Sequence, residues 1–159
     1  VTNGPLLTFT VNGHIPGDEI QLTGDAVEVN AGAQSIVPLE KLEIYFNGKV
    51  IASSDGSPTR KRIPIDRSGW ITVRATNSKP QHPIDDSYIA GETSPVYVYK
   101  GGQPIRSKAD AEYFIKWIDD ITRQAQAHSG WRSDRERSHV LGQFRQARAV
   151  FEQRAKESQ

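Results

Sequence analysis

The stretch LEKLEIYFNGKVIASS, residues 39–54, decides the fold class. Apolar residues in its first half alternate with polar ones, which predicts a strand with one buried face. The pair Asn47-Gly48 follows, and it favours a type I′ turn because both central residues need a positive φ. A second apolar strand then returns, so the stretch predicts a β-hairpin. Its predicted buried face consists of Leu42, Ile44, Phe46, Val50 and Ala52.

Short β-branched runs of the same kind lie on both sides of this hairpin, separated by Gly, Pro and Asn turns. GWITVRAT (residues 69–76) predicts a central strand, SPVYVYK (94–100) predicts the last one, and Pro64 marks an edge. About seven or eight strands at this spacing are typical of a sandwich rather than a parallel sheet. The polar segment 77–92, rich in Pro and Asp, predicts a surface loop.

The periodicity changes near Ser107, from the period of strands to that of helices. Ser107 predicts an N-cap, and the helix that follows is expected to end near Gly130. Ser133 and Glu136 have the spacing of a capping box for a second helix. Because the link between the helices is only about five residues long, the two helices are expected to be antiparallel neighbours.

These patterns predict a mainly β protein with an α-helical end. We expect an Ig-like antiparallel β-sandwich over residues 1–104 and a helical hairpin over residues 105–159, packed on the sandwich as one compact unit. The chain begins at Val1 and contains no Met, which favours a piece of a longer protein.

The composition excludes several classes of function. With 20 Lys+Arg against 19 Asp+Glu, the chain offers no charge that would recruit nucleic acid or an anionic membrane. The absence of Cys excludes disulfides, thiolate nucleophiles and Cys-based zinc sites. It also suits an exported bacterial protein, so we expect a periplasmic or secreted location and leave a cytoplasmic one open.

One local cluster has the side chains of a metal site. His82, Asp85 and Asp86 place three hard ligands within five residues of the long loop. The favoured interpretation is a solvated turn shaped by Pro80 and Pro83, with a weak divalent-ion site as the alternative. We therefore predict no catalytic residues and no cofactor for this chain.

Five residues are the candidates for an interaction surface. Tyr97 and Tyr99 alternate with valines, so one pair faces outward, where it is able to stack on sugar rings or seal against another domain. Trp131 lies beside the interhelical turn, as a recognition aromatic or, more simply, packed over the turn. Arg132 and Arg135 lie next to it and are suited to an acidic partner surface.

Other large or charged residues have structural explanations. Trp70 is expected in the sandwich core, and Trp117 is expected to clamp the first helix to the sheet. The basic cluster TRKR (59–62) is expected to be a solvated edge strand, since Lys and Arg deter pairing between edges.

Five stretches form an ordered set that covers nearly the whole chain: VNGHIPGDEIQL (11–22), PLEKLEIYFNGKVI (38–51), SGWITVRA (68–75), ETSPVYVYKGGQPI (92–105) and the tail ADAEYFIKWIDDI…WRSDRERSHVLGQFRQARAVFE (109–152). Together they resemble the C-terminal region of bacterial CehA/McbA-type metallohydrolases, relatives of the PHP phosphoesterases. In that family a hydrolase domain rich in His and Asp comes first, and a β-sandwich with terminal helices follows it. The family's His-x-His hallmark is absent here, so no catalytic residue carries over.

The resemblance implies a non-catalytic accessory or interaction domain. Its partner would be the missing catalytic domain, with homo-oligomerisation as a further possibility, and no nucleic acid or membrane is expected to bind. The alternative is a ligand- or carbohydrate-binding module of an exported bacterial protein that uses exposed aromatics and loop 82–86. A small enzyme built on His82, Asp85 and Asp86 is the least favoured hypothesis.

Overall fold

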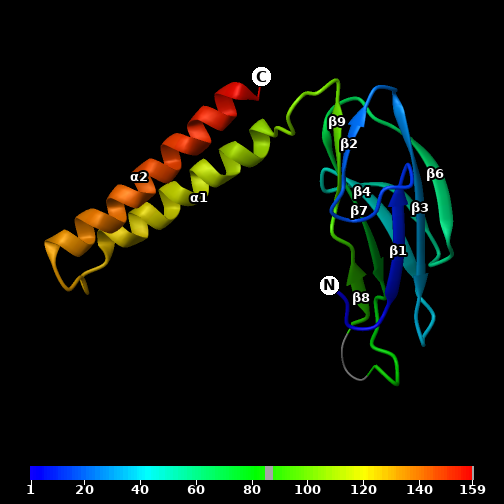
Figure 1. Ribbon diagram of the computed structural model, residues 1–159. Coiled ribbons are helices and arrows are strands. Elements are labelled where there is room, and N and C mark those ends of the chain that lie inside the picture. The colour runs from blue at the N-terminus through cyan, green and yellow to red at the C-terminus, as the bar shows by residue number, and fades with distance from the viewer. Residues whose placement is uncertain (85–87, 159) are drawn as a thin grey trace. The chain divides into compact units, whose positions relative to one another are not determined.

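The computed structural model describes residues 1–84 and 88–158. The chain divides into two compact units, Val1–Ile105 with the strands and Arg106–Gln159 with the helices (Figure 1). The expectation that the helices pack on the sandwich stays a prediction. The strands are β1 (Leu6–Val11), β2 (Glu19–Leu22), β3 (Ala26–Gln34), β4 (Lys41–Phe46), β5 (Lys49–Ser54), β6 (Thr59–Pro64), β7 (Gly69–Thr76), β8 (Ala90–Glu92) and β9 (Val96–Lys100). The helices are α1 (Lys108–Ala127) and α2 (Asp134–Glu157).

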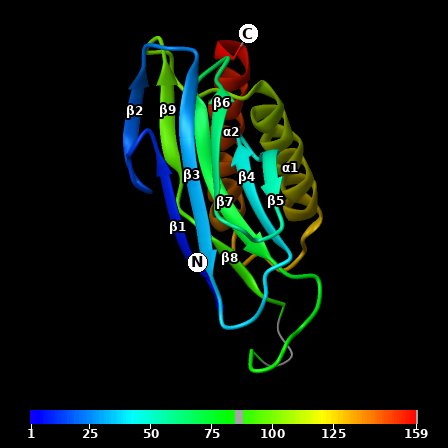
Figure 2. The ribbon, with the colours of Figure 1, turned by 90° about the vertical axis from the view of Figure 1, so that its right-hand side faces the viewer.

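Two sheets form the first unit (Figure 2). One has the order β1-β3-β6 and is antiparallel throughout. The other has the order β2-β9-β7-β4-β5, with β8 paired to β7. In this second sheet β2 runs parallel to β9, which departs from the fully antiparallel sandwich that the sequence predicts. The β-sandwich followed by two helices is otherwise confirmed.

Alternation along the strands places one face of each sheet in a common core. The buried residues of β4, β7 and β9 meet those of β1 and β3, which is why the two sheets hold together as layers. The central residues of this core, all fully buried, are Val11, Val27, Val29, Leu42, Ile44, Ile71, Val73, Val96 and Val98.

The β4–β5 hairpin turns where the sequence predicts. Asn47 and Gly48 have φ values of 48° and 77°, as a type I′ turn requires. The prediction for Val50 is wrong, because the register shifts between Ile44 and Tyr45. This irregularity pairs Val50 with Tyr45 and leaves it exposed, while Ala52 packs against the core.

Both helices begin at the N-cap residues that the sequence predicts. Ser107 Oγ accepts a hydrogen bond from Asp110 N, and Ser133 Oγ accepts one from Glu136 N, at 3.2 and 3.1 Å. The Glu136 carboxylate accepts from Arg132 N rather than from the N-cap residue, so the capping box is shifted by one residue. Within the described residues, neither helix is long and apolar enough to cross a membrane.

Candidate interaction surfaces

Four aromatic side chains lie on the side of the larger sheet that faces away from the core. They alternate along their strands with buried residues, and each is half-buried. Trp70 of β7 is the register partner of Tyr97 of β9, so the two residues are neighbours across the strands on the same side of the sheet. We call Tyr45, Trp70, Tyr97 and Tyr99 the outer aromatic face.

Trp70 corrects one prediction, because it is not in the core. Ile71 and Val73 are fully buried, so Trp70 has the parity of the exposed Arg74. The β4–β5 turn supports the backbone of Trp70. Asn47 Oδ1 accepts from Trp70 N, and Asn47 N donates to Trp70 O, both at 3.0 Å.

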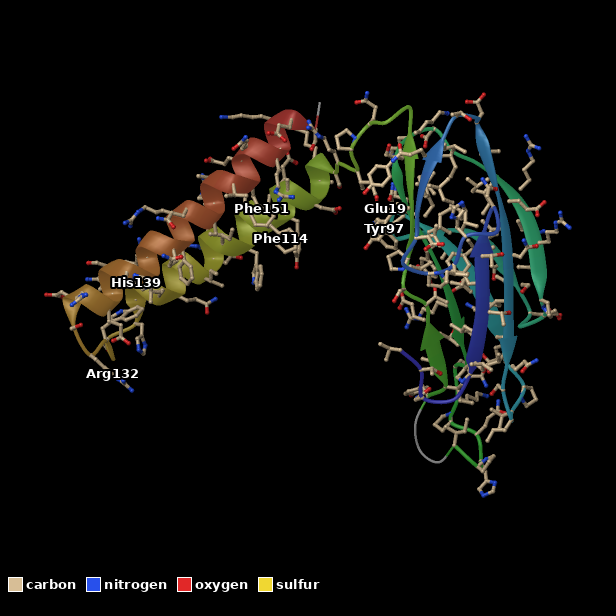
Figure 3. The ribbon with its side chains drawn as sticks, in the orientation of Figure 1. Glu19, Tyr97, Phe114, Arg132, His139 and Phe151 are labelled. Carbon is tan, nitrogen blue, oxygen red and sulfur yellow. The ribbon has the colours of Figure 1, made fainter. Side chains whose placement is uncertain are left out.

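Polar side chains border the face along β2. Glu19 is the register partner of Tyr97, and Gln21 is that of Tyr99. Both polar residues are exposed. Figure 3 shows Glu19 and Tyr97 together on the outward side of their strands. The Tyr97 and Tyr99 rings therefore have hydrogen-bonding groups beside them, an arrangement suited to a partner with both apolar and polar surface.

The opposite border holds a small polar network. Tyr45 Oη donates to Glu43 Oε2 at 2.9 Å, and Arg74 is the register partner of Glu43. Burial raises the pKa of Tyr45 above its ordinary value, and the Glu43 carboxylate raises it further. Tyr45 therefore stays neutral and keeps its hydroxyl proton as a donor at physiological pH.

Thr72 lies between Trp70 and Arg74 on the same side of β7. It is only 4% exposed, and its Oγ1 has no hydrogen-bond partner among the described residues. A buried hydroxyl without a partner is unusual and costs stability.

The predicted metal cluster is only partly described. His82 lies in the long loop, joined to Pro83 by a cis peptide bond. Asp85 and Asp86 lie outside the described residues. Among residues 1–84 and 88–158, no three His, Asp or Glu side chains come together as metal ligands.

The candidates on the helical unit gather at the interhelical turn. Trp131 is half-buried there, and its Nε1–H donates to Ala125 O at 3.2 Å. The His128 ring packs edge-on against it, 5.5 Å between centroids. These contacts favour local packing over the turn. Arg132, labelled in Figure 3, and Arg135 are exposed beside it.

A second group of aromatic residues lies on the helical unit, partly between the helices and partly on their exposed surface. The rings of Phe114 and Phe151 stack at 4.9 Å, and Figure 3 shows them facing each other across the hairpin. The rings of Trp117 and Tyr113 also lie beside Phe114, with centroids 6.0 and 5.4 Å from its centroid. We call Tyr113, Phe114, Trp117 and Phe151 the helix aromatic cluster. Tyr113 is 64% exposed and Trp117 53% exposed, and the predicted contact of Trp117 with the sheet remains a prediction.

Alternation along β9 predicts that one pair faces outward, and the structure shows that this pair is Tyr97 and Tyr99. Their neighbours Tyr45 and Trp70 are not predicted from the sequence. A signal was present for Trp70, because it shares the parity of Arg74 in the run 69–76. Tyr45 carries the same signal, since it alternates with the apolar Ile44 and Phe46. The interaction candidates lie in two places: Tyr97 and Tyr99 on β9, and Trp131, Arg132 and Arg135 around the interhelical turn.

No protein-family model matches this chain. No curated protein sequence is significantly similar to it. Among solved structures, it is similar to fibronectin(III)-like modules of Clostridium thermocellum CbhA, with 21% sequence identity and a TM-score of 0.40. This match covers 62% of the chain and 100% of the module.

Proposed function

We propose that this chain is a non-catalytic accessory module of a larger PHP-like metal-dependent hydrolase, on which it docks through the outer aromatic face. That face is the observation that carries the proposal. Aromatic side chains with a charged border are the composition of protein–protein interfaces, and their partly exposed rings gain most from being covered. The ordered resemblance to the C-terminal region of CehA/McbA-type enzymes supports the choice of partner.

The chemistry of the face also favours docking over catalysis. Two of its titratable groups hold each other: Glu43 accepts a hydrogen bond from Tyr45, and the raised pKa of Tyr45 keeps its hydroxyl neutral. Glu19 lies at an exposed edge strand. Catalytic acids and bases usually lie in closed sites from which water is excluded, and an exposed edge strand is not such a site.

Binding to the polypeptide encoded upstream of Val1 tests the proposal. That polypeptide, expressed separately, is titrated with the 159-residue chain by calorimetry. Tyr97→Glu is expected to weaken binding at least tenfold, because it places a charge among the aromatic rings. Tyr88→Glu is the matched control, since Tyr88 is an exposed tyrosine of the same unit outside the face.

Three results would overturn the proposal. The upstream polypeptide lacks a His- and Asp-rich hydrolase, or it does not bind the chain. In the third, the chain alone hydrolyses phosphoesters with added Zn²⁺ or Mn²⁺, at a rate that stays constant through further purification.

A carbohydrate ligand is the second candidate, favoured by the Trp70–Tyr97 pair beside Glu19 and Gln21. Aromatic rings stack on the apolar faces of sugars, and a neighbouring carboxylate and amide supply hydrogen bonds. For a carbohydrate-binding module we expect a periplasmic or secreted location. A glycan array decides it: binding lost in Trp70→Ala supports it, and an array without any signal eliminates it.

A further inference from the structure

The helical unit buries too little to be complete as a lone hairpin. In α1 only Ala111 and Ile118 are buried, and in α2 no residue is. Helices in proteins are stabilised mainly by packing their apolar stripes, not by helix propensity. A pair of helices with such a small buried seam therefore needs further cover.

The uncovered apolar surface lies on one side of the hairpin. Arg148 and Asp119 join the helices on the other side, with Arg148 Nε donating to Asp119 Oδ1 at 2.7 Å. Trp117 is two residues before Asp119, and Val150 is two residues after Arg148. Two residues correspond to about 200° around a helix, so Trp117 and Val150 both lie opposite the ion pair. Val150 is 50% exposed, and with the exposed Tyr113 and Trp117 of the helix aromatic cluster it forms an apolar patch on this side.

We propose that a second copy of this chain covers this side, so that two hairpins form a four-helix bundle. Helices of 20 and 24 residues, at about 1.5 Å per residue and 10 Å width, present a face of roughly 600 Å² per copy. Two such faces give about 1,200 Å², the lower end of the range for a specific interface. In a twofold dimer the same patch meets itself, so an aromatic side pairs with an aromatic side.

Charge complementarity favours a second copy over an unrelated partner. Asp110 is seven residues before Trp117 and Arg154 is four after Val150, so both border the uncovered side. They lie at the same end of the hairpin, because Arg106 contacts Glu157 there. In the proposed dimer, α1 of one copy packs on α2 of the other, and the interhelical turns of both copies lie at the same end of the bundle. Asp110 of each copy then lies next to Arg154 of the other copy. Two reciprocal ion pairs result.

The mass of the full chain in solution, by light scattering after gel filtration, is the first test. At tens of micromolar we expect twice the 17.7 kDa of a single chain. Trp117→Glu and Tyr113→Glu should each give the mass of one chain while the helical circular dichroism at 222 nm is retained. Tyr88→Glu is the control, since Tyr88 is 63% exposed against 64% for Tyr113, and it should leave the dimer intact.

The second test exchanges the charges. Asp110→Arg and Arg154→Asp should each weaken self-association by about tenfold, because each brings two like charges together twice. An equimolar mixture of the two variants should restore the dimer, since both ion pairs re-form between unlike copies. Docking on an unrelated surface does not predict this rescue.

Several results would overturn the proposal. Wild-type chain that stays monomeric at 100 micromolar places another occupant on this side, the sandwich of the same chain included. A dimer that survives Trp117→Glu uses a different surface. Failure of the mixture to restore association rejects the reciprocal arrangement of Asp110 and Arg154.

Discussion

The position of Trp70 depends on small residues around the β4–β5 turn. A Cβ at Gly69 would come within 2.5 Å of the Asn47 amide and of the Phe46 ring, so only a hydrogen fits there. Asn47 and Gly48 carry the positive φ values that close the turn. These residues hold the start of β7 against the turn, and they thereby position Trp70 in the outer aromatic face.

Gly69→Ala is therefore expected to lower the free energy of unfolding by about 1–3 kcal/mol, because the added methyl group overlaps the turn. Urea denaturation followed by tryptophan fluorescence measures the change. Gly24→Ala is the control, since no atom of residues 1–84 or 88–158 lies within 4 Å of a Cβ at that position, and its effect should stay within about 0.5 kcal/mol. Equal effects of the two substitutions would contradict the steric explanation.

Because the Thr72 hydroxyl is buried, we expect that its replacement stabilises the folded protein. Thr72→Val replaces a buried hydroxyl, which has no hydrogen-bond partner in the described part of the chain, by a methyl group of similar size, and we expect a gain of about 1 kcal/mol in the free energy of unfolding. Thr76→Val, on the same strand but half-buried, should change little. Destabilisation by Thr72→Val would mean that the hydroxyl has a partner, such as a water molecule.

At the scale of elements, the signals that act over a few residues predicted most of the fold. The Asn47-Gly48 turn and the caps at Ser107 and Ser133 are where the sequence places them, because each depends on local backbone chemistry. The register shift in β4–β5 was not predictable, since alternation assumes an unbroken ladder. The parallel pairing of β2 with β9 was missed for a similar reason: it depends on residues 75 or more apart in sequence.

The ion pair between the helices predicts how the pH changes their stability. The hydrogen bond from Arg148 holds the pKa of Asp119 below its ordinary value. The stabilisation is therefore fully present above the pKa that Asp119 has in the unfolded chain, about 4. It is lost as the pH falls through the lower pKa that Asp119 has in the folded protein. Asp119→Asn should lower the helix melting temperature at pH 7 and have little effect at pH 2.

Thermal melts at 222 nm across this pH range provide the measurement. Glu112→Gln, which changes an exposed carboxylate on the same helix, should keep the wild-type pH dependence. An Asp119→Asn variant that loses as much stability at pH 2 as at pH 7 would assign the effect to packing rather than to charge.

At the scale of the whole molecule, the change of periodicity correctly predicts a sandwich followed by a helical hairpin. The surfaces were harder to predict. Alternation along residues 69–76 divides the side chains into two sets, and only three-dimensional packing decides which set faces inward. Trp70 was assigned to the wrong set because a large aromatic is more often buried than not.

The sandwich unit is expected to fold without the helices. Its end is fixed within the unit, because Ser68 Oγ donates to Gln103 O at 2.6 Å and accepts from Lys100 N at 2.9 Å. A chain that ends at Ile105 should therefore unfold cooperatively in urea, with a midpoint close to that of the sandwich in the full chain. A truncated chain without a cooperative transition would show that the sandwich depends on the helices.

The parallel pairing of β2 with β9 also determines how the module would bear tension. Force that pulls β2 from its start and β9 from its end acts along the strands. It loads the four register pairs from Glu19–Tyr97 to Leu22–Lys100 together, along with the flanking bonds from Gly17 N to Pro95 O and from Tyr97 N to Asp18 O. Hydrogen bonds that share a shear load must break nearly at once, whereas strands that are peeled apart from one end lose their hydrogen bonds one at a time. Pulled in this direction, the sandwich would act as a stiff mechanical spacer.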